Sequence, residues 1–235
     1  MNQPPDRLRH WPAFVAKMRQ ANLAPAVIET FHNYYQMVVS GERGLIANRE
    51  IRPIRIQEVR NSDDLAPYGP AGRKAMARFV MIVLNGGLGT SMGLQTAKSL
   101  LPVKEGLSFL DLIVQQAQRF DTRLAIMNSF STDADTRSAL ERIQTSPEPL
   151  IFLQNKFPKI LRTGFAPATW PTNPSLEWNP PGHGDVYTAL FTSGTLQRLL
   201  DENICYALIR NSDNLGATAD TDLLGYFASQ NLPFM

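Results

Sequence analysis

The chain reads Phe-Val-Met-Ile-Val-Leu from residue 79 to residue 84 and continues as Asn-Gly-Gly-Leu-Gly-Thr-Ser-Met-Gly from residue 85 to residue 93. A continuous apolar run of this length, bounded by a glycine-rich turn, is typical of a central strand that helices bury on both faces. In such a fold the turn lies at the carboxyl edge of the sheet, where ligands bind. The stretch therefore predicts an α/β fold with a binding loop at residues 85–93.

Segments with strand and helix patterns alternate after this loop. Ser108 and Asp111 form a capping-box-like start for a helix over residues 109–120. Apolar runs predict further strands at residues 124–127, 150–153 and 205–209, with helical segments at 132–144 and 185–201 between them. This alternation predicts a doubly wound, mostly parallel sheet.

An N-terminal helical layer is expected ahead of the sheet. Pro12 and Pro25 suit the first turns of two helices, the second of which should end at Ser40-Gly41. Residues 42–74 contain several prolines and glycines with weak periodicity, so we expect an irregular connection there. Residues 164–184 hold five prolines and read as a long loop, which inside a compact domain is commonly functional.

Composition narrows the class of protein. The chain has 23 basic and 21 acidic side chains and no block of like charge, which does not suggest a nucleic-acid or anionic-membrane partner. The single cysteine, Cys205, lies in an apolar run, so we expect a buried thiol in a reducing compartment. The sequence has neither a signal-peptide core nor the roughly 18 consecutive apolar residues of a membrane span. We expect a soluble, cytoplasmic protein.

The glycine-rich loop supplies the first chemistry. Glycines let backbone amides approach phosphates without side-chain collision, and the amides donate to anionic oxygens. The spacing is not that of the dinucleotide fingerprint, nor of a Walker A loop, because Met92 and Ala97 stand where that motif needs glycine. A turn of this kind can be purely structural, and a lone lysine is usually a solvated surface charge. Lys98, however, lies close enough after the loop to reach phosphates that the loop holds.

Several segments together resemble one family. Residues 84–93 with Lys98-Ser99 are similar to the nucleotide-binding signature of the eukaryotic-type UDP-glucose pyrophosphorylase family. Residues 127–133, 152–160, 179–187 and 211–217 resemble that family in order and spacing, so the likeness covers residues 79–235. One departure is Ala97, where the family usually has proline.

The resemblance implies a fold and a reaction. It implies an N-terminal helical segment at residues 1–75 and a Rossmann-like, GT-A-like nucleotide-binding catalytic domain at residues 76–235, incomplete at its C-terminal end. The implied reaction forms UDP-glucose and pyrophosphate from UTP and glucose 1-phosphate, with Mg²⁺ as cofactor. Two alternatives stay open: a uridylyltransferase for another sugar 1-phosphate, and a truncated UTP-binding module without turnover. An uncovered face of the sheet would also allow self-association.

The resemblance also implies three catalytic residues. Lys98 would hold the triphosphate, His183 would contact glucose 1-phosphate and Asp213 would take the metal. His183 lies between glycines in a proline-rich loop, which does not suit a core histidine. Asp213 follows an apolar strand at the carboxyl edge, where a carboxylate can bind magnesium, although it could equally form a turn.

The remaining expected site residues bind the nucleotide and the sugar phosphate. Gln154 and Gly182 would meet the uracil edge, and a glutamine amide has the donor and the acceptor that uracil needs, although a glutamine after a strand is often a surface residue. Residues 84–87 would hold the uridine and sugar-phosphate ends. The full set of expected binding residues is Leu84, Asn85, Gly86, Gly87, Met127, Gln154, Gly182, His183, Asn211 and Ser212.

Overall fold

The computed structural model describes residues 8–89, 96–143 and 145–235. Its contacts divide the chain into two compact units. The first unit is Met1–Pro53 with Asn155–Thr188, and the second unit is Ile54–Gln154 with Ala189–Met235. The predicted boundary between an N-terminal helical segment at residues 1–75 and a catalytic domain at residues 76–235 stays a prediction.

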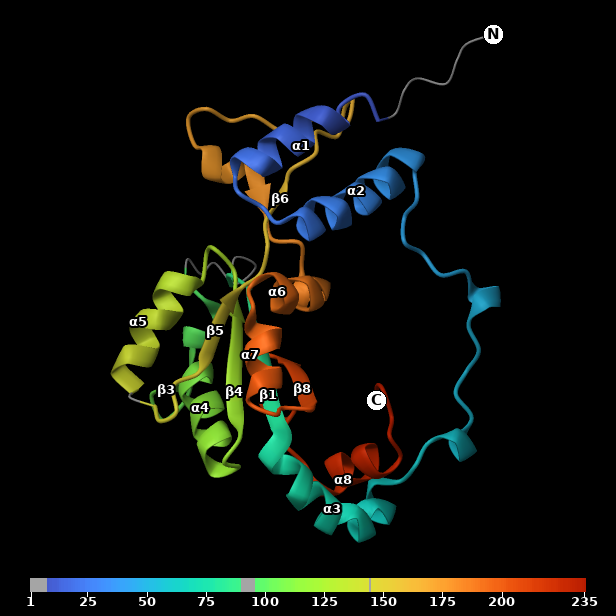
Figure 1. Ribbon diagram of the computed structural model, residues 1–235, viewed down its shortest axis with the longest axis vertical. Helices are drawn as coiled ribbons and strands as arrows, with labels where there is room; N and C mark the ends of the chain where they lie inside the picture. Colours follow the sequence, from blue (N-terminus) through green and yellow to red (C-terminus); the bar gives the residue numbers. More distant parts are fainter. Residues whose placement is uncertain (1–7, 90–95, 144) are drawn as a thin grey trace. The chain divides into compact units, whose positions relative to one another are not determined.

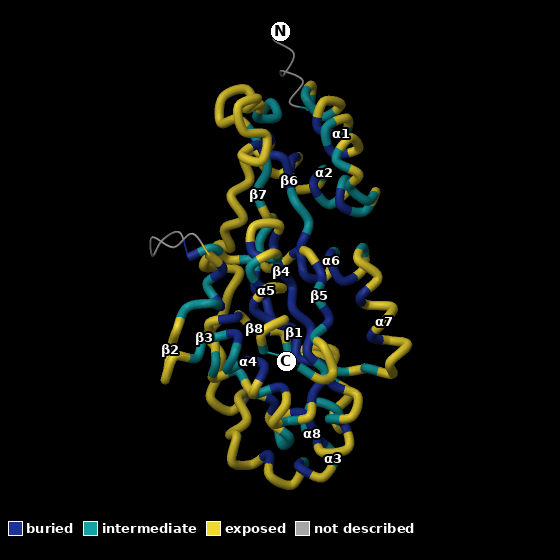
Figure 2. The backbone as a smooth tube through the Cα atoms, turned by 90° about the vertical axis from the view of Figure 1, so that its left-hand side faces the viewer, coloured by how far each residue is buried: buried dark blue, intermediate teal, exposed yellow. Residues whose placement is uncertain are grey.

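A four-stranded parallel sheet forms the centre of the second unit (Figure 1). Its strands are β1 (Phe79–Asn85), β4 (Arg123–Asn128), β5 (Leu150–Leu153) and β8 (Tyr206–Asn211), in the order β5-β4-β1-β8. Every residue of β1 is buried, as its unbroken apolar run requires (Figure 2). The predicted α/β fold with a parallel central sheet is confirmed.

Helices pack on this sheet. α4 (Phe109–Arg119) and α5 (Asp133–Ile143) share one apolar cluster with β1 and β4. α4 begins at the predicted capping box, in which the Ser108 backbone N donates to Asp111 Oδ2 at 2.8 Å and the Asp111 backbone N donates to Ser108 Oγ at 3.2 Å. Figure 2 shows α7 (Thr195–Asp201) on the other side of the sheet from α4. The predicted helical stretch 185–201 is two helices, α6 (Val186–Thr192) and α7.

The expectation of an irregular connection over residues 42–74 is wrong for its last part. The chain forms short 3-10 turns at Ile56–Glu58 and Ser62–Tyr68 and then the helix α3 (Gly69–Ala75), which packs against α8 (Thr221–Ser229). We call this pair of helices the glycine corner. A Cβ atom on Gly72 would lie 1.6 Å from the Thr221 carbonyl oxygen, and one on Gly225 would lie 2.0 Å from the Tyr68 carbonyl oxygen. These glycines allow close helix packing, which overrides their weak helix propensity.

The cysteine prediction is also wrong. Cys205 is exposed, and its Sγ lies 2.6 Å from Arg78 Nη2. It immediately precedes β8, which is one of the two edge strands of the described sheet. An edge strand is covered less completely than β1, so an apolar run there does not imply burial.

The first unit has its own apolar cluster. α1 (Trp11–Gln20) and α2 (Pro25–Ser40) carry the predicted prolines, Pro12 and Pro25, in their first turns, and Gly41 caps the C-terminal end of α2. The two helices pack with Phe157 of β6 (Phe157–Pro158), which pairs with β7 (Trp178–Asn179). Lys17 forms an ion pair with Glu177 and holds the pKa of that carboxyl below its usual range. The same Lys17 donates to the Ala168 carbonyl oxygen at 2.7 Å, so the proline-rich loop is anchored to α1.

The remaining described elements are short. They are the hairpin strands β2 (Pro102–Lys104) and β3 (Leu107–Ser108) and the 3-10 turns at Asn48–Glu50, Met76–Arg78, Lys98–Leu100, Pro174–Glu177 and His183–Asp185. Every helix in the described part of the chain is too short or too polar to cross a bilayer.

Candidate functional site

The carboxyl ends of the four strands meet along one edge of the sheet. Leu84 of β1 is in register with Met127 of β4 and with Asn211 of β8. The Ser212 backbone N donates to the Leu84 carbonyl oxygen at 3.2 Å, which continues the pairing past the end of β8. The structure therefore brings together the predicted site residues of the second unit, namely Leu84, Asn85, Gly86, Gly87, Met127, Gln154, Asn211 and Ser212.

Lys98 and Asp213 touch at this edge. Lys98 Nζ lies 2.7 Å from Asp213 Oδ2, and the two side chains are 35% and 38% exposed. Lys98 also donates its backbone N–H to the Gly87 carbonyl oxygen at 3.1 Å, so its segment is held against the glycine-rich turn. We call Lys98 and Asp213 the edge pair. Because an exposed ion pair adds little stability, both charges can be given up to a ligand at small cost.

The glycine-rich loop is described on either side of its middle. The predictions for Thr90, Ser91, Met92 and Gly93 fall on residues outside the described ranges. Ala97, where the resembled family has proline, is fully buried with φ −57°. That φ is close to the one that proline imposes, so the backbone at this position already has the conformation that a proline would select.

Gln154 is buried directly over the turn. Its side chain is 5% exposed, and its backbone N donates to the Asn128 carbonyl oxygen at 2.8 Å. A Cβ on Gly86 would lie 2.0 Å from Gln154 Nε2, so only glycine at residue 86 leaves room for this amide. Gln154 Oε1 has no hydrogen-bond partner among the described residues. An unpaired buried acceptor costs about 1–3 kcal/mol, so a ligand N–H at this position would be stabilised.

A buried polar network fixes the end of β1. Asn85 Nδ2 donates to Asn128 Oδ1 at 2.8 Å and to Thr136 Oγ1 at 2.9 Å. Thr132 Oγ1 donates to the Asn85 carbonyl oxygen at 2.8 Å. Asn85 therefore uses its amide group to hold two strand ends and α5 together. Sequence reasoning gave Thr136 no role, because a hydrogen bond between residues 51 apart leaves no local pattern.

Gly182 and His183 belong to the first unit. His183 begins a 3-10 turn (His183–Asp185) and is exposed, which excludes a core histidine. The turn is held by Asp185, whose Oδ2 accepts a 2.6 Å hydrogen bond from the Asn155 backbone N. Burial raises the pKa of the Asp185 carboxyl, and the hydrogen bonds from Asn155 oppose that rise. The substrate contacts expected of Gly182 and His183 stay predictions.

Asp213 is the candidate metal ligand at the carboxyl edge. The described residues contain no group of three or more histidine, cysteine or acidic side chains that could hold a metal. Magnesium in nucleotide enzymes is commonly held by one or two carboxylates together with phosphates and waters. Asp213 at the carboxyl edge fits that arrangement, with the phosphates of a nucleotide completing the coordination.

Known proteins resemble this chain over most of its length. A family model described as UTP–glucose-1-phosphate uridylyltransferase matches residues 28–235. The uridylyltransferase of Solanum tuberosum is 38% identical over 207 residues, covering 83% of this chain and 43% of its own. The probable UTP–glucose-1-phosphate uridylyltransferase of Schizosaccharomyces pombe is 32% identical over 187 residues. The match covers 76% of this chain and 37% of the relative.

Solved structures are similar as well. A mutant UDP-glucose pyrophosphorylase from Leishmania major in complex with UDP-glucose has a TM-score of 0.84 and 38% identity, covering 95% of this chain and 48% of its own. A structure titled UDP-glucose phosphorylase, from Trypanosoma brucei, has a TM-score of 0.81 and 37% identity, with 95% and 48% coverage. The chain spans about half the length of the relatives it matches, or less.

Proposed function

Since the chain belongs to the UTP–glucose-1-phosphate uridylyltransferase family, we propose that it carries the nucleotide-binding half of an enzyme that makes UDP-glucose and pyrophosphate from UTP and glucose 1-phosphate. The observation that carries the proposal is the edge pair, a cation and a carboxylate in contact beside the glycine-rich turn. The UDP-glucose bound in the Leishmania major relative supports the choice of product.

The proposed reaction needs no protein nucleophile. An oxygen of the glucose 1-phosphate phosphate attacks the α-phosphorus of UTP in line, the new P–O bond forms, and the bond from the α-phosphorus to the bridging oxygen of pyrophosphate breaks. The obstacle is repulsion, because two unit charges about 4 Å apart cost about 4 kcal/mol at an effective dielectric of 20. The protein's task is therefore to gather positive charge and to align the reactants.

Each candidate residue has a role in this proposal. Lys98 neutralises the triphosphate, and the backbone amides of the turn donate to phosphate oxygens. Asp213 would hold magnesium, which when bound supplies charge neutralisation at the phosphates. Gln154 and Gly182 read the uracil edge, and His183 contacts glucose 1-phosphate. The other contacts to nucleotide and sugar phosphate come from Leu84, Asn85, Gly86, Gly87, Met127, Asn211 and Ser212.

A calorimetric titration with UTP, run beside a pyrophosphate-release assay, tests the proposal on the 235-residue chain. We expect UTP to bind more tightly than CTP, because uracil and cytosine present different donor and acceptor patterns to Gln154. Selective binding without pyrophosphate release would favour the alternative of a UTP-binding module. Absence of selective binding would contradict both readings.

We also propose a cytoplasmic location, because a chain with a single cysteine has no intrachain disulfide and fits a reducing compartment. Glucose 1-phosphate remains the proposed sugar substrate, with another sugar 1-phosphate as the alternative. A comparison of kcat/KM for glucose 1-phosphate and N-acetylglucosamine 1-phosphate, in an active enzyme that contains this chain, distinguishes the two.

His183→Ala is expected to lower kcat/KM for glucose 1-phosphate by about 10²-fold, while the Kd for UTP changes by less than about twofold. The reason is that an exposed imidazole contributes little to packing, so its loss should appear only where it meets a substrate. Steady-state kinetics on both substrates make the measurement. His32→Ala, which removes a histidine stacked on Trp11 in the same unit, is the matched control and should leave the sugar-phosphate kinetics unchanged. An unchanged kcat/KM in His183→Ala removes this residue from the site.

Self-association is the last part of the proposal. We propose that it uses the face of the sheet at β8, where Ile209 is 37% exposed. An uncovered apolar face can be buried against a second copy of the chain. We expect multi-angle light scattering to give a mass that rises with concentration for the 235-residue chain, and Ile209→Lys to shift it toward the monomer. A constant monomeric mass in both proteins would contradict this expectation.

A further inference from the structure

Arg210 is a buried arginine that the proposed reaction does not use. It lies on β8, in register with Val83 of β1, and is only 3% exposed. Its Nη1 donates to Gln116 Oε1 and to the Ala217 carbonyl oxygen, both at 2.8 Å. Arg210 is therefore held inside the second unit, on the α4 side of β8 and next to the carboxyl edge.

Stability alone does not account for this arginine. Nε and Nη2 of Arg210 have no hydrogen-bond partner among the described residues, and burial lowers the pKa of the guanidinium. A buried charge without a carboxylate partner is unfavourable, and an apolar residue of similar size would often serve packing equally well. The contacts that Arg210 does make are therefore the place to look for its function.

Those contacts hold the turn that carries Asp213. Gln116 of α4 accepts from Arg210 and donates its Nε2 to the Leu215 carbonyl oxygen at 3.0 Å. Arg210 and Gln116, which we call the brace, thus bind two carbonyl groups of residues 212–217, which we call the edge turn. Within the edge turn the Ala217 backbone N donates to the Asn214 carbonyl oxygen at 3.3 Å, which is longer than the 2.8 Å bond from Arg210 to the Ala217 carbonyl oxygen.

The same helix also supports the segment of Lys98. The Phe109 backbone N at the start of α4 donates to the Leu101 carbonyl oxygen at 3.2 Å. Leu100, two residues after Lys98, packs against the apolar cluster that α4 shares with the sheet. The start of α4 therefore contacts the segment that carries Lys98, and Gln116 of α4 contacts the turn that carries Asp213.

We infer that Arg210 and Gln116 are positioning residues, which hold the edge turn so that Asp213 meets Lys98 and is placed for a magnesium-bound nucleotide. The inference rests on the proposed function for its ligand and on the hydrogen bonds for its geometry. The brace acts through Asp213, so removing it should reproduce part of the effect of losing the Asp213 carboxylate.

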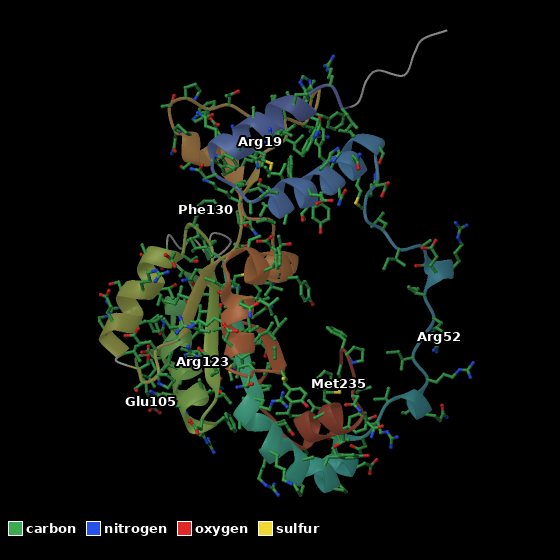
Figure 3. The ribbon with its side chains drawn as sticks, viewed as in Figure 1. Arg19, Arg52, Glu105, Arg123, Phe130 and Met235 are labelled. Atoms are coloured by element: carbon green, nitrogen blue, oxygen red, sulfur yellow. The ribbon has the colours of Figure 1, made fainter. Side chains whose placement is uncertain are left out.

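Four variants separate the brace from general packing. Both Arg210→Met and Gln116→Met remove the hydrogen bonds to the edge turn; Gln116→Met keeps the side-chain length, and Arg210→Met keeps an unbranched apolar stem. Arg210→Lys keeps a charged donor and should restore part of what Arg210→Met loses. The matched control is Arg123→Met, because Arg123 also anchors a carbonyl, that of Glu148 at 2.6 Å, but starts β4 at the opposite end of the strand (Figure 3).

Amide hydrogen exchange tests the brace without any ligand. We expect exchange of the residue 213–217 amides to rise about tenfold or more in Arg210→Met and Gln116→Met, because the local opening free energy falls when the brace is lost. Arg123→Met should leave those amides unchanged even if it lowers the melting temperature. Unchanged exchange in both brace variants would overturn the inference.

The second measurement is the ratio of the Kd for UTP without Mg²⁺ to the Kd with Mg²⁺, determined by calorimetry. We expect this ratio to fall about fivefold or more in the brace variants and to stay at the wild-type value in Arg123→Met. In Gln116→Met combined with Asp213→Asn we expect no loss beyond that of Asp213→Asn, because both changes act on one carboxylate. Fully additive losses would overturn the inference. If the wild-type chain does not bind UTP, the proposed function fails, and the exchange data still decide whether the brace holds the turn.

Discussion

Lys98→Ala is expected to lower kcat for UDP-glucose synthesis by about 10²–10³-fold in an active enzyme that contains this chain. Lys98 places a positive charge beside the glycine-rich turn, where the developing charge of the phosphates needs it. The same change should hardly affect folding. An ion pair whose members are 35% and 38% exposed contributes at most about 1 kcal/mol.

Pyrophosphate release measures the loss, and thermal unfolding checks the fold. Lys104→Ala is the matched control, since Lys104 is exposed on the β2 hairpin strand outside the proposed site. It should keep wild-type kinetics. If Lys98→Ala turned over like wild type with the same melting temperature, Lys98 would be an ordinary surface lysine and the site would have to be sought elsewhere.

Gly72→Ala is expected to destabilise the second unit by about 3 kcal/mol, which for a chain of this size lowers the melting temperature by about 6–12 °C. The added methyl would meet the Thr221 carbonyl oxygen at 1.6 Å, and a backbone group cannot rotate away as a flexible side chain can. The two helices of the glycine corner must then separate, which exposes Leu224 of α8 and disturbs the edge-to-face contact between the rings of Tyr68 and Tyr226.

Calorimetric or spectroscopic unfolding decides this prediction. Gly225→Ala places a methyl 2.0 Å from the Tyr68 carbonyl oxygen and should be comparably destabilising. Ser229→Ala on the exposed end of α8 is the control and should change stability by less than about 0.5 kcal/mol. Equal melting temperatures for all three variants would mean that the glycine corner is not packed as described.

The parts of the fold that sequence predicted well are those with strong local signals. The apolar run before the glycine-rich loop forms β1, residues 150–153 form β5 and Ser108 caps α4. The misses were decided by tertiary contacts. The sequence pattern treated Gly69 and Gly72 as helix breakers. They nevertheless lie in α3, at positions where α8 packs so closely that a side chain would not fit. Cys205 read as buried because its neighbours are apolar, but it precedes an edge strand.

The sequence indicated part of the candidate site but not the contacts that support it. Ligands bind at the carboxyl ends of parallel strands, and this expectation together with the motif resemblance indicated residues that meet at one sheet edge, among them Gln154 and Asp213. They did not reveal what holds those residues. Arg210 and Gln116 are 94 residues apart, and each looks ordinary in its own segment. Long-range polar contacts between single residues leave no periodicity in a sequence, so only the fold could reveal them.

The edge pair has a consequence for which ligands can enter. Lys98 Nζ and Asp213 Oδ2 lie 2.7 Å apart and neutralise each other, so a charged ligand that binds either residue competes with the other residue of the pair. A bare polyanion that takes Lys98 leaves Asp213 facing negative phosphates. A ligand that carries both a cation and an anion exchanges partners with both residues at once. The free site should therefore favour magnesium-bound nucleotide over metal-free nucleotide by a modest factor, since the exposed pair contributes at most about 1 kcal/mol.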